Sequence, residues 1–69
     1  MERILVRDSM GLLTGIIEIN ERGDKIVRDS RGRYLGRYDV LTNTTMDPMG
    51  RFLYKGDQAS ILFGLIKLD

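Results

Sequence analysis

The stretch Val27-Arg28-Asp29-Ser30-Arg31-Gly32-Arg33-Tyr34-Leu35-Gly36-Arg37-Tyr38 decides the fold, because it reads as a strand, a tight turn and a second strand. Asp29 opens the turn, where its carboxylate can accept a hydrogen bond from a backbone N–H two residues further along. Gly32 occupies the position that must take a positive φ, as in a three-residue hairpin loop that ends in a glycine bulge. With β-rich residues on both sides, this stretch predicts a β-hairpin.

The same frame, D-x-x-G-x-x-x-G, recurs along the chain. Successive frames begin at Asp8, Asp29, Asp47 and Asp57, and the last is degenerate because Ser60 replaces its first glycine. Pro48 follows Asp47, and this is the favoured place for proline in a type I turn. The turn-defining residues are Asp8, Gly11, Asp29, Gly32, Asp47, Pro48 and Gly50. Such repetition predicts an all-β fold, a small quasi-symmetric assembly of short hairpin repeats that forms one domain over residues 1–69.

The C-terminal segment, residues 57–68, can be interpreted in two ways. Asp57 to Ser60 would cap a helix, and Ile61, Leu62, Leu65 and Leu68 would form its apolar stripe. A glycine within that helix, Gly64, would cost about 1 kcal/mol. The repeat frame instead makes the segment a strand, and we favour the strand.

Two polar connections separate the repeats. Residues 20–24 contain Gly23 and are predicted to form a second kind of turn, and residues 42–45 are their counterpart. Both are too short to link separate domains.

Composition argues against an enzyme. The 69 residues include no histidine and no cysteine, which removes the commonest general base, the commonest metal ligand and any thiolate. The carboxylates of Asp8, Asp29, Asp47 and Asp57 would need converging oxygen atoms to bind Ca²⁺, and their place in turns explains them better. We expect no catalytic residue, no metal and no cofactor.

Apolar residues occupy both faces of the predicted strands, whereas a sheet with one solvated face should alternate cleanly. Six of them alternate with the predicted core residues, so they would face the opposite side of the sheet. These six are candidates for self-association: Leu12, Ile16, Leu35, Leu53, Phe63 and Leu65. Alternatively, bulges or bends at Gly15, Gly36 and Gly64 would turn these side chains into the core of the single chain. Because so small a domain is marginally stable alone, we expect a homo-oligomer.

The net charge is only +1, but residues 22–37 hold six basic side chains against two acidic ones. Arg31, Arg33 and Arg37 are therefore candidates for binding an anion or a nucleic acid, next to Tyr34 and Tyr38. In a regular strand Arg33 and Arg37 would face away from both tyrosines. A nucleic-acid partner is therefore less favoured than a protein partner.

The V-R-D-S-x-G-R-x-x-G hairpin and the apolar A-S-I-L-F-G segment resemble the small bacterial β-flower proteins. Four frames resemble the four-fold type, in which short hairpin repeats are arranged radially about an axis. The resemblance covers nearly the whole chain and implies a quasi-symmetric all-β domain of unassigned role, with no functional residues to carry over. The PRC-barrel, which has a single V-x-D-x-x-G-x-x-I-G motif, is a weaker second resemblance because it lacks the repetition.

No positively charged stretch precedes a signal-like apolar run, and no apolar run approaches the ~20 residues that a membrane span needs. We therefore expect a cytoplasmic protein without a membrane partner. The expected function is a non-catalytic structural or protein-interaction module that self-associates. The alternative is an anion- or nucleic-acid-binding module that uses the arginine-rich second hairpin.

Overall fold

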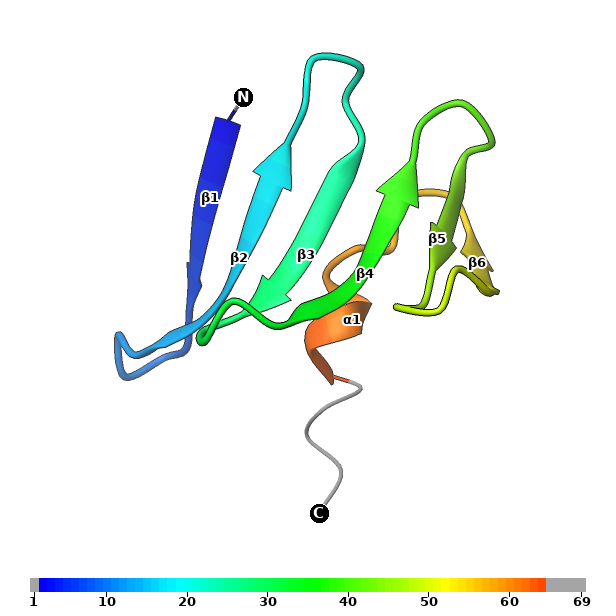
Figure 1. Cartoon of the computed structure of the whole chain (residues 1–69). Coiled ribbons are helices and arrows are strands. Elements are labelled where there is room, and N and C mark those ends of the chain that lie inside the picture. The colour runs from blue at the N-terminus through cyan, green and yellow to red at the C-terminus, as the bar shows by residue number, and fades with distance from the viewer. Residues whose placement is uncertain (1, 65–69) are drawn as a thin grey trace.

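The computed structural model describes residues 2–64. Six antiparallel strands form one sheet, and their order in the sheet is their order in the sequence (Figure 1). The strands are β1 (Glu2–Arg7), β2 (Leu13–Ile19), β3 (Lys25–Asp29), β4 (Tyr34–Asp39), β5 (Thr44–Met46) and β6 (Phe52–Lys55). The predicted all-β fold of short hairpins is confirmed.

One short helix, α1 (Ile61–Gly64), follows the sheet. It lies against one side of the sheet near β3 and β4, at a distance from β1 (Figure 1). We call this side the helix face and the opposite side the outer face. Paired residues of neighbouring strands share a face, so the ladder Ile4, Ile17 and Val27 lies on the helix face. The ladder Arg3, Glu18, Ile26 and Arg37 lies on the outer face.

The core lies between the helix and the middle of the sheet. Val27, Leu35, Ala59 and Leu62 are its buried residues. Ile17, Tyr38, Leu53 and Phe63 pack against them as partly buried side chains. No residue of β1 belongs to this cluster within residues 2–64. Among these described residues, the core cluster therefore includes residues of β2, β3, β4 and β6 but none of the first strand.

A β-bulge follows the first, second and third repeat turns. The register shifts leave one residue without a cross-strand partner in each hairpin: Thr14, Leu35 and Leu53. In the second hairpin, Val27 pairs with Gly36 and Arg28 pairs with Tyr34. Because of the extra residue, both Leu35 and Tyr38 contact the core although they are three positions apart. The predicted alternative of a bulge beside Gly36 is therefore confirmed for Leu35, whose side chain is turned into the core.

Gly36 also allows a close approach of backbone to backbone. Its φ is +137°, a conformation that residues with a side chain rarely adopt. A Cβ at this position would overlap the carbonyl oxygen of Met46 and lie 3.0 Å from Cδ1 of Leu62. The absence of a side chain therefore lets β4 pack closely against β5 and α1.

The predicted C-terminal strand is wrong over Ile61–Gly64, which is helical. The three true turns close on a glycine with φ between +84° and +89°, and Ser60 in the fourth frame carries a Cβ that disfavours this conformation. Asp57 instead accepts a hydrogen bond from the Ala59 N–H at 3.3 Å, a local side-chain turn. The N–H groups of Ile61 and Leu62 then donate to carbonyls three residues back. Gly64 is the last described residue of this helix. Residues 65–68 of the predicted strand lie outside the described residues.

Candidate interaction surface

Three repeat turns share one geometry and lie at the same end of the sheet. In each turn the glycine N–H donates to the carbonyl oxygen of the aspartate at 3.0 Å. Oδ1 of the same aspartate accepts hydrogen bonds from the backbone N–H groups two and four residues further along. These distances are 2.9 and 3.0 Å at Asp8, 2.9 and 2.8 Å at Asp29, and 3.0 and 2.8 Å at Asp47. Gly11, Gly32 and Gly50 have the positive φ that the sequence predicts.

The carboxylates of these turns accept hydrogen bonds from backbone N–H groups of the same turn. Hydrogen bonds from the Arg33 N–H, and then from the Arg31 N–H, lower the pKa of Asp29 while burial opposes the shift. The N–H of Arg51 lowers the pKa of Asp47 in the same way, and its side chain adds to the effect. No group of three or more acidic, histidine or cysteine side chains is arranged to hold a metal ion within the described residues.

The loop over residues 20–24 forms the same turn, not the second kind that the sequence predicts. Gly23 has a φ of +97° and donates to the Asn20 carbonyl at 3.0 Å. Asn20 Oδ1 accepts from the N–H groups of Arg22 and Asp24, both at 3.0 Å. Asparagine therefore takes the role of aspartate, and N-x-x-G in place of D-x-x-G is the signal that could have identified this turn.

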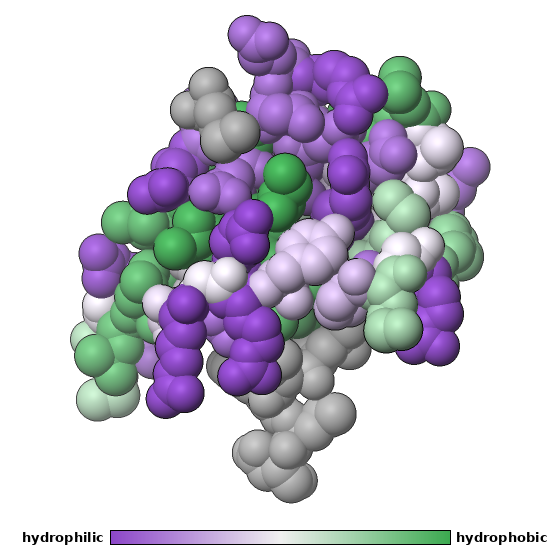
Figure 2. All heavy atoms as spheres, in the orientation of Figure 1, coloured by the Kyte–Doolittle hydropathy of each residue, from purple (hydrophilic) through white to green (hydrophobic). Residues whose placement is uncertain are grey.

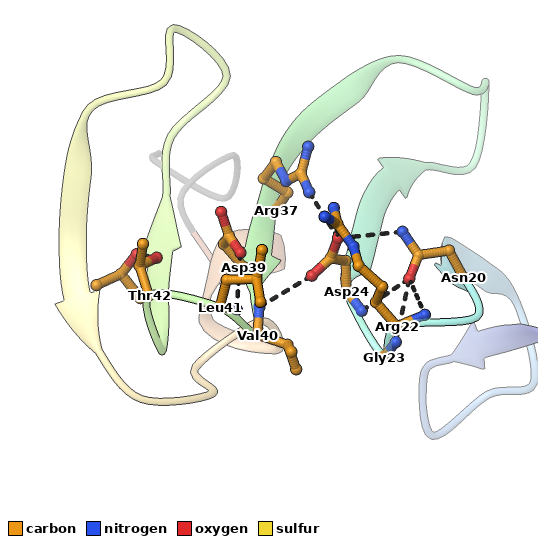
Figure 3. A network of polar contacts seen from close by, with 10 residues as sticks. Asn20, Arg22, Gly23, Asp24, Arg37, Asp39, Val40, Leu41 and Thr42 are labelled. Carbon is orange, nitrogen blue, oxygen red and sulfur yellow. Dashed lines mark hydrogen bonds and ion pairs between the residues drawn. The ribbon is translucent and has the colours of Figure 1, made fainter.

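Asp24 is the buried polar centre at the opposite end of the sheet from the three repeat turns (Figure 3). Its side chain is fully buried. Oδ1 accepts from the Val40 N–H at 2.9 Å, and Oδ2 accepts from the Asn20 amide at 3.1 Å and from Arg37 at 3.0 Å. Arg22 forms a second ion pair with the same oxygen. The Val40 N–H, followed by Asn20 and Arg22, lowers the pKa of Asp24 to about 2, although burial opposes the shift. Asp24 thus joins the turn after β2 to the end of β4.

Two of the three arginines predicted to bind anions have carboxylate partners in their own chain. Arg33 pairs with Asp29 at 3.5 Å and Arg37 pairs with Asp24. Arg31 lies exposed at the tip of its turn. An equivalent pair joins Arg51 to Asp47 at 2.9 Å, so an arginine directly after the turn glycine is a repeated structural feature.

The predicted separation of Arg37 from Tyr34 is wrong. The bulge at Leu35 changes the parity of β4, so Tyr34 pairs with Arg28 while Arg37 pairs with Ile26. Arg28 and Ile26 are two positions apart on one strand and share the outer face. Tyr34 and Arg37 therefore lie on that face together with Arg28, which is paired with Glu18 at 3.1 Å.

The predicted self-association residues do not form one surface. Leu35 is buried, and Leu53 and Phe63 pack against the core, because bulged strands and the helix turn them inward. Ile16 is half-buried on the outer face, opposite Leu5 and Arg28. Only Leu12 is largely exposed, and Leu65 lies outside the described residues.

A different set of apolar residues is exposed, and sequence reasoning missed most of it. The first hairpin presents Ile4, Leu5, Met10 and Leu12 with exposed fractions of 46, 50, 81 and 63%. Green hydrophobic spheres accordingly gather at the lower left of Figure 2, over β1, β2 and the turn between them. Further exposed residues lie in later loops and on β6: Val40, Leu41, Met49, Phe52 and Tyr54. The first hairpin is therefore the candidate interaction surface, because Ile4 and Leu5 are exposed on the two faces of an edge strand.

Comparison with known proteins identifies no relative: no family model, no curated protein and no solved structure matches the chain. Within residues 2–64, no helix has the length and apolar character needed to cross a membrane.

Proposed function

We propose that this protein is a non-catalytic structural or protein-interaction module that associates with further copies of itself through its first hairpin. The observation that carries the proposal is the position of β1. Five of its six residues are exposed, and none belongs to the core within the described part of the chain.

Exposure of this strand is energetically unfavourable on both faces. Ile4 projects to the helix face and Leu5 to the outer face, and each is about half exposed. Complete burial of such a side chain stabilises a protein by ~1.5–3 kcal/mol, so a partner that contacted both side chains would gain part of this value. The small core gives the isolated domain a stability of only about 3–5 kcal/mol, and association would add to it.

The repeated hairpin architecture supports a structural role. It also supports the resemblance to β-flower proteins, with the difference that the fourth turn of this kind is the N-x-x-G turn at Asn20 and not the degenerate frame at Asp57.

Sedimentation velocity across a dilution series tests the proposal. We expect the average mass to exceed that of one chain at tens of micromolar and to fall on dilution, with a melting temperature that falls in parallel. Ile4→Glu should abolish the association, because it places a charge at the centre of the exposed strand, where the natural side chain is apolar and 46% exposed. Leu41→Glu is the matched control, since Leu41 is equally apolar and 72% exposed but lies in the loop after β4. A mass of one chain at every concentration would overturn the proposal.

Anion or nucleic-acid binding is a second candidate, favoured by the placement of Tyr34, Arg28 and Arg37 on one face. Stacking on an aromatic ring beside basic groups is typical of single-strand binding. The carboxylate partners of both arginines reduce the charge that this face offers. Fluorescence anisotropy with a labelled single-stranded oligonucleotide tests the candidate. Binding that weakens steeply between 50 and 200 mM salt is expected for phosphate contacts, and no binding at 50 mM would exclude it.

A further inference from the structure

We propose that the partner of β1 is β1 of a second copy, paired antiparallel across a two-fold axis so that the two Ile4 residues lie opposite each other. This inference rests on the proposed self-association and adds its geometry. It extends the sheet through its first edge and leaves the bulged hairpins unchanged.

The edge of the sheet at β1 is suited to such pairing. Of the described strands, only β2 pairs with β1, so the outer row of backbone N–H and C=O groups is free to accept another strand. The six residues contain neither proline nor glycine, the residues that usually weaken an edge. The opposite edge, β6, has four residues and itself contains the unpaired bulge residue of its hairpin, Leu53, whereas the bulge of the first hairpin lies on β2. The first edge is therefore the longer and more regular one.

A two-fold axis perpendicular to the sheet keeps the helix faces of both copies on the same side. It also restricts the register, because opposite residues must then share a face. With Ile4 opposite Ile4, the ladder Ile17–Ile4 of one copy meets Ile4–Ile17 of the second. Four isoleucines would form one row on the helix face, continuous with Val27 in each copy. Each Ile4, which is 46% exposed in the single chain, would then have an isoleucine neighbour on both sides.

Charge favours this register over its neighbours. In the Ile4 register, Glu2 lies opposite Val6 and Arg3 lies opposite Leu5, so no like charges meet. Shifting the centre to Leu5 places Arg3 opposite Arg7, and shifting it to Arg3 places the two Arg3 side chains together. Like charges directly opposite each other destabilise a strand pair. Larger shifts pair fewer of the six residues.

Cysteine cross-linking tests the register directly, because the natural chain contains no cysteine. In Ile4→Cys, the two Cα atoms would lie ~4.5–5.5 Å apart, within the range of ~4.4–6.8 Å that a disulfide requires. In Leu5→Cys, the equivalent atoms are displaced by two residues along the strands and lie roughly 8 Å apart. Leu41→Cys, in an exposed loop, reports random collisions. Each variant is oxidised with diamide at a protein concentration at which the unmodified chain associates, and the products are measured by intact mass under non-reducing conditions.

We expect Ile4→Cys to form disulfide-linked dimers at least tenfold faster than Leu5→Cys and Leu41→Cys. A mixture of Arg3→Cys and Leu5→Cys chains should cross-link to each other in preference to themselves. Equal rates for the three single variants, or a faster rate for Leu5→Cys, would overturn this register. If sedimentation still showed a dimer in that case, self-association would stand and only its geometry would fail. A single-chain mass at all concentrations would refute both.

Discussion

Replacing Gly36 with alanine tests the central packing feature of the fold, the close approach of β4 to β5 and α1. Gly36 has a φ of +137°, and a residue with a side chain in such a sparsely populated region costs about 1–3 kcal/mol. The added Cβ would also overlap the Met46 carbonyl oxygen and lie 3.0 and 3.1 Å from the two terminal carbons of Leu62. Overpacking a well-packed core typically costs a further ~1–3 kcal/mol. The two effects together amount to ~2–6 kcal/mol, comparable with the whole stability of about 3–5 kcal/mol expected for a domain of this size.

Gly32→Ala is the matched control. Gly32 has a φ of +89°, and nothing lies within 4 Å of the position that its Cβ would occupy. This variant therefore has the backbone strain alone, about 1–2 kcal/mol, and should remain folded.

The assay is urea unfolding followed by far-ultraviolet circular dichroism, at one fixed protein concentration so that association contributes equally. With a slope of about 1 kcal/mol per molar urea for a small domain, Gly32→Ala should lower the midpoint by ~1–2 M. Gly36→Ala should be largely unfolded even without urea. Equal midpoints for the two variants would refute the close approach of β4 to β5 and α1, because only backbone strain would then distinguish alanine from glycine at either position.

Three further predictions concern the turn, the core and the buried carboxylate. Gly32→Val should destabilise the protein more than Arg31→Ala, because only valine places a β-branched side chain at positive φ; equal urea midpoints would contradict the turn geometry. Leu62→Ala should lower the free energy of unfolding by ~2–5 kcal/mol, since Leu62 is fully buried, and a loss below 0.5 kcal/mol would contradict the packing of α1. The folded-state pKa of Asp24 is about 2 against an ordinary value of 3.8, so its contribution to stability is complete above pH ~4 and is lost as the pH falls towards 2. Asp24→Asn should therefore show a weaker dependence of unfolding free energy on pH in this window than the unmodified chain, and identical profiles would contradict the network.

Three repeat turns were predictable from the sequence because their chemistry is local. An aspartate whose Oδ1 reaches N–H groups two and four residues away, and a glycine free to take positive φ, are both contained within five residues. The all-β fold follows from the spacing of these turns. The fourth turn of the same kind, at Asn20, was not predicted because an asparagine there takes the place of the aspartate.

What the sequence left open was decided by contacts between distant residues. The segment that leads into the helix is held by Asp57, which pairs with Lys25, and by Thr45, whose hydroxyl accepts the Gln58 N–H at 3.0 Å. The burial of Asp24 depends on Val40 and Arg37, both more than ten residues away. The two partners of each contact are brought together only when the strands pair, so no local sequence pattern predicts these contacts.

The candidate surface was likewise predictable from the sequence only in part. From the sequence alone, apolar residues on both faces of the strands indicated either self-association or bulges that turn them inward. The bulge at Leu35 adds one residue to β4 and thereby changes the face of the sheet to which each later side chain of that strand projects. This outcome depends on the strand register and not on the composition. The position of α1 near β3 and β4 then leaves β1 uncovered. Local turn chemistry determined that this chain forms hairpins, and only the tertiary packing decided which apolar residues remain exposed.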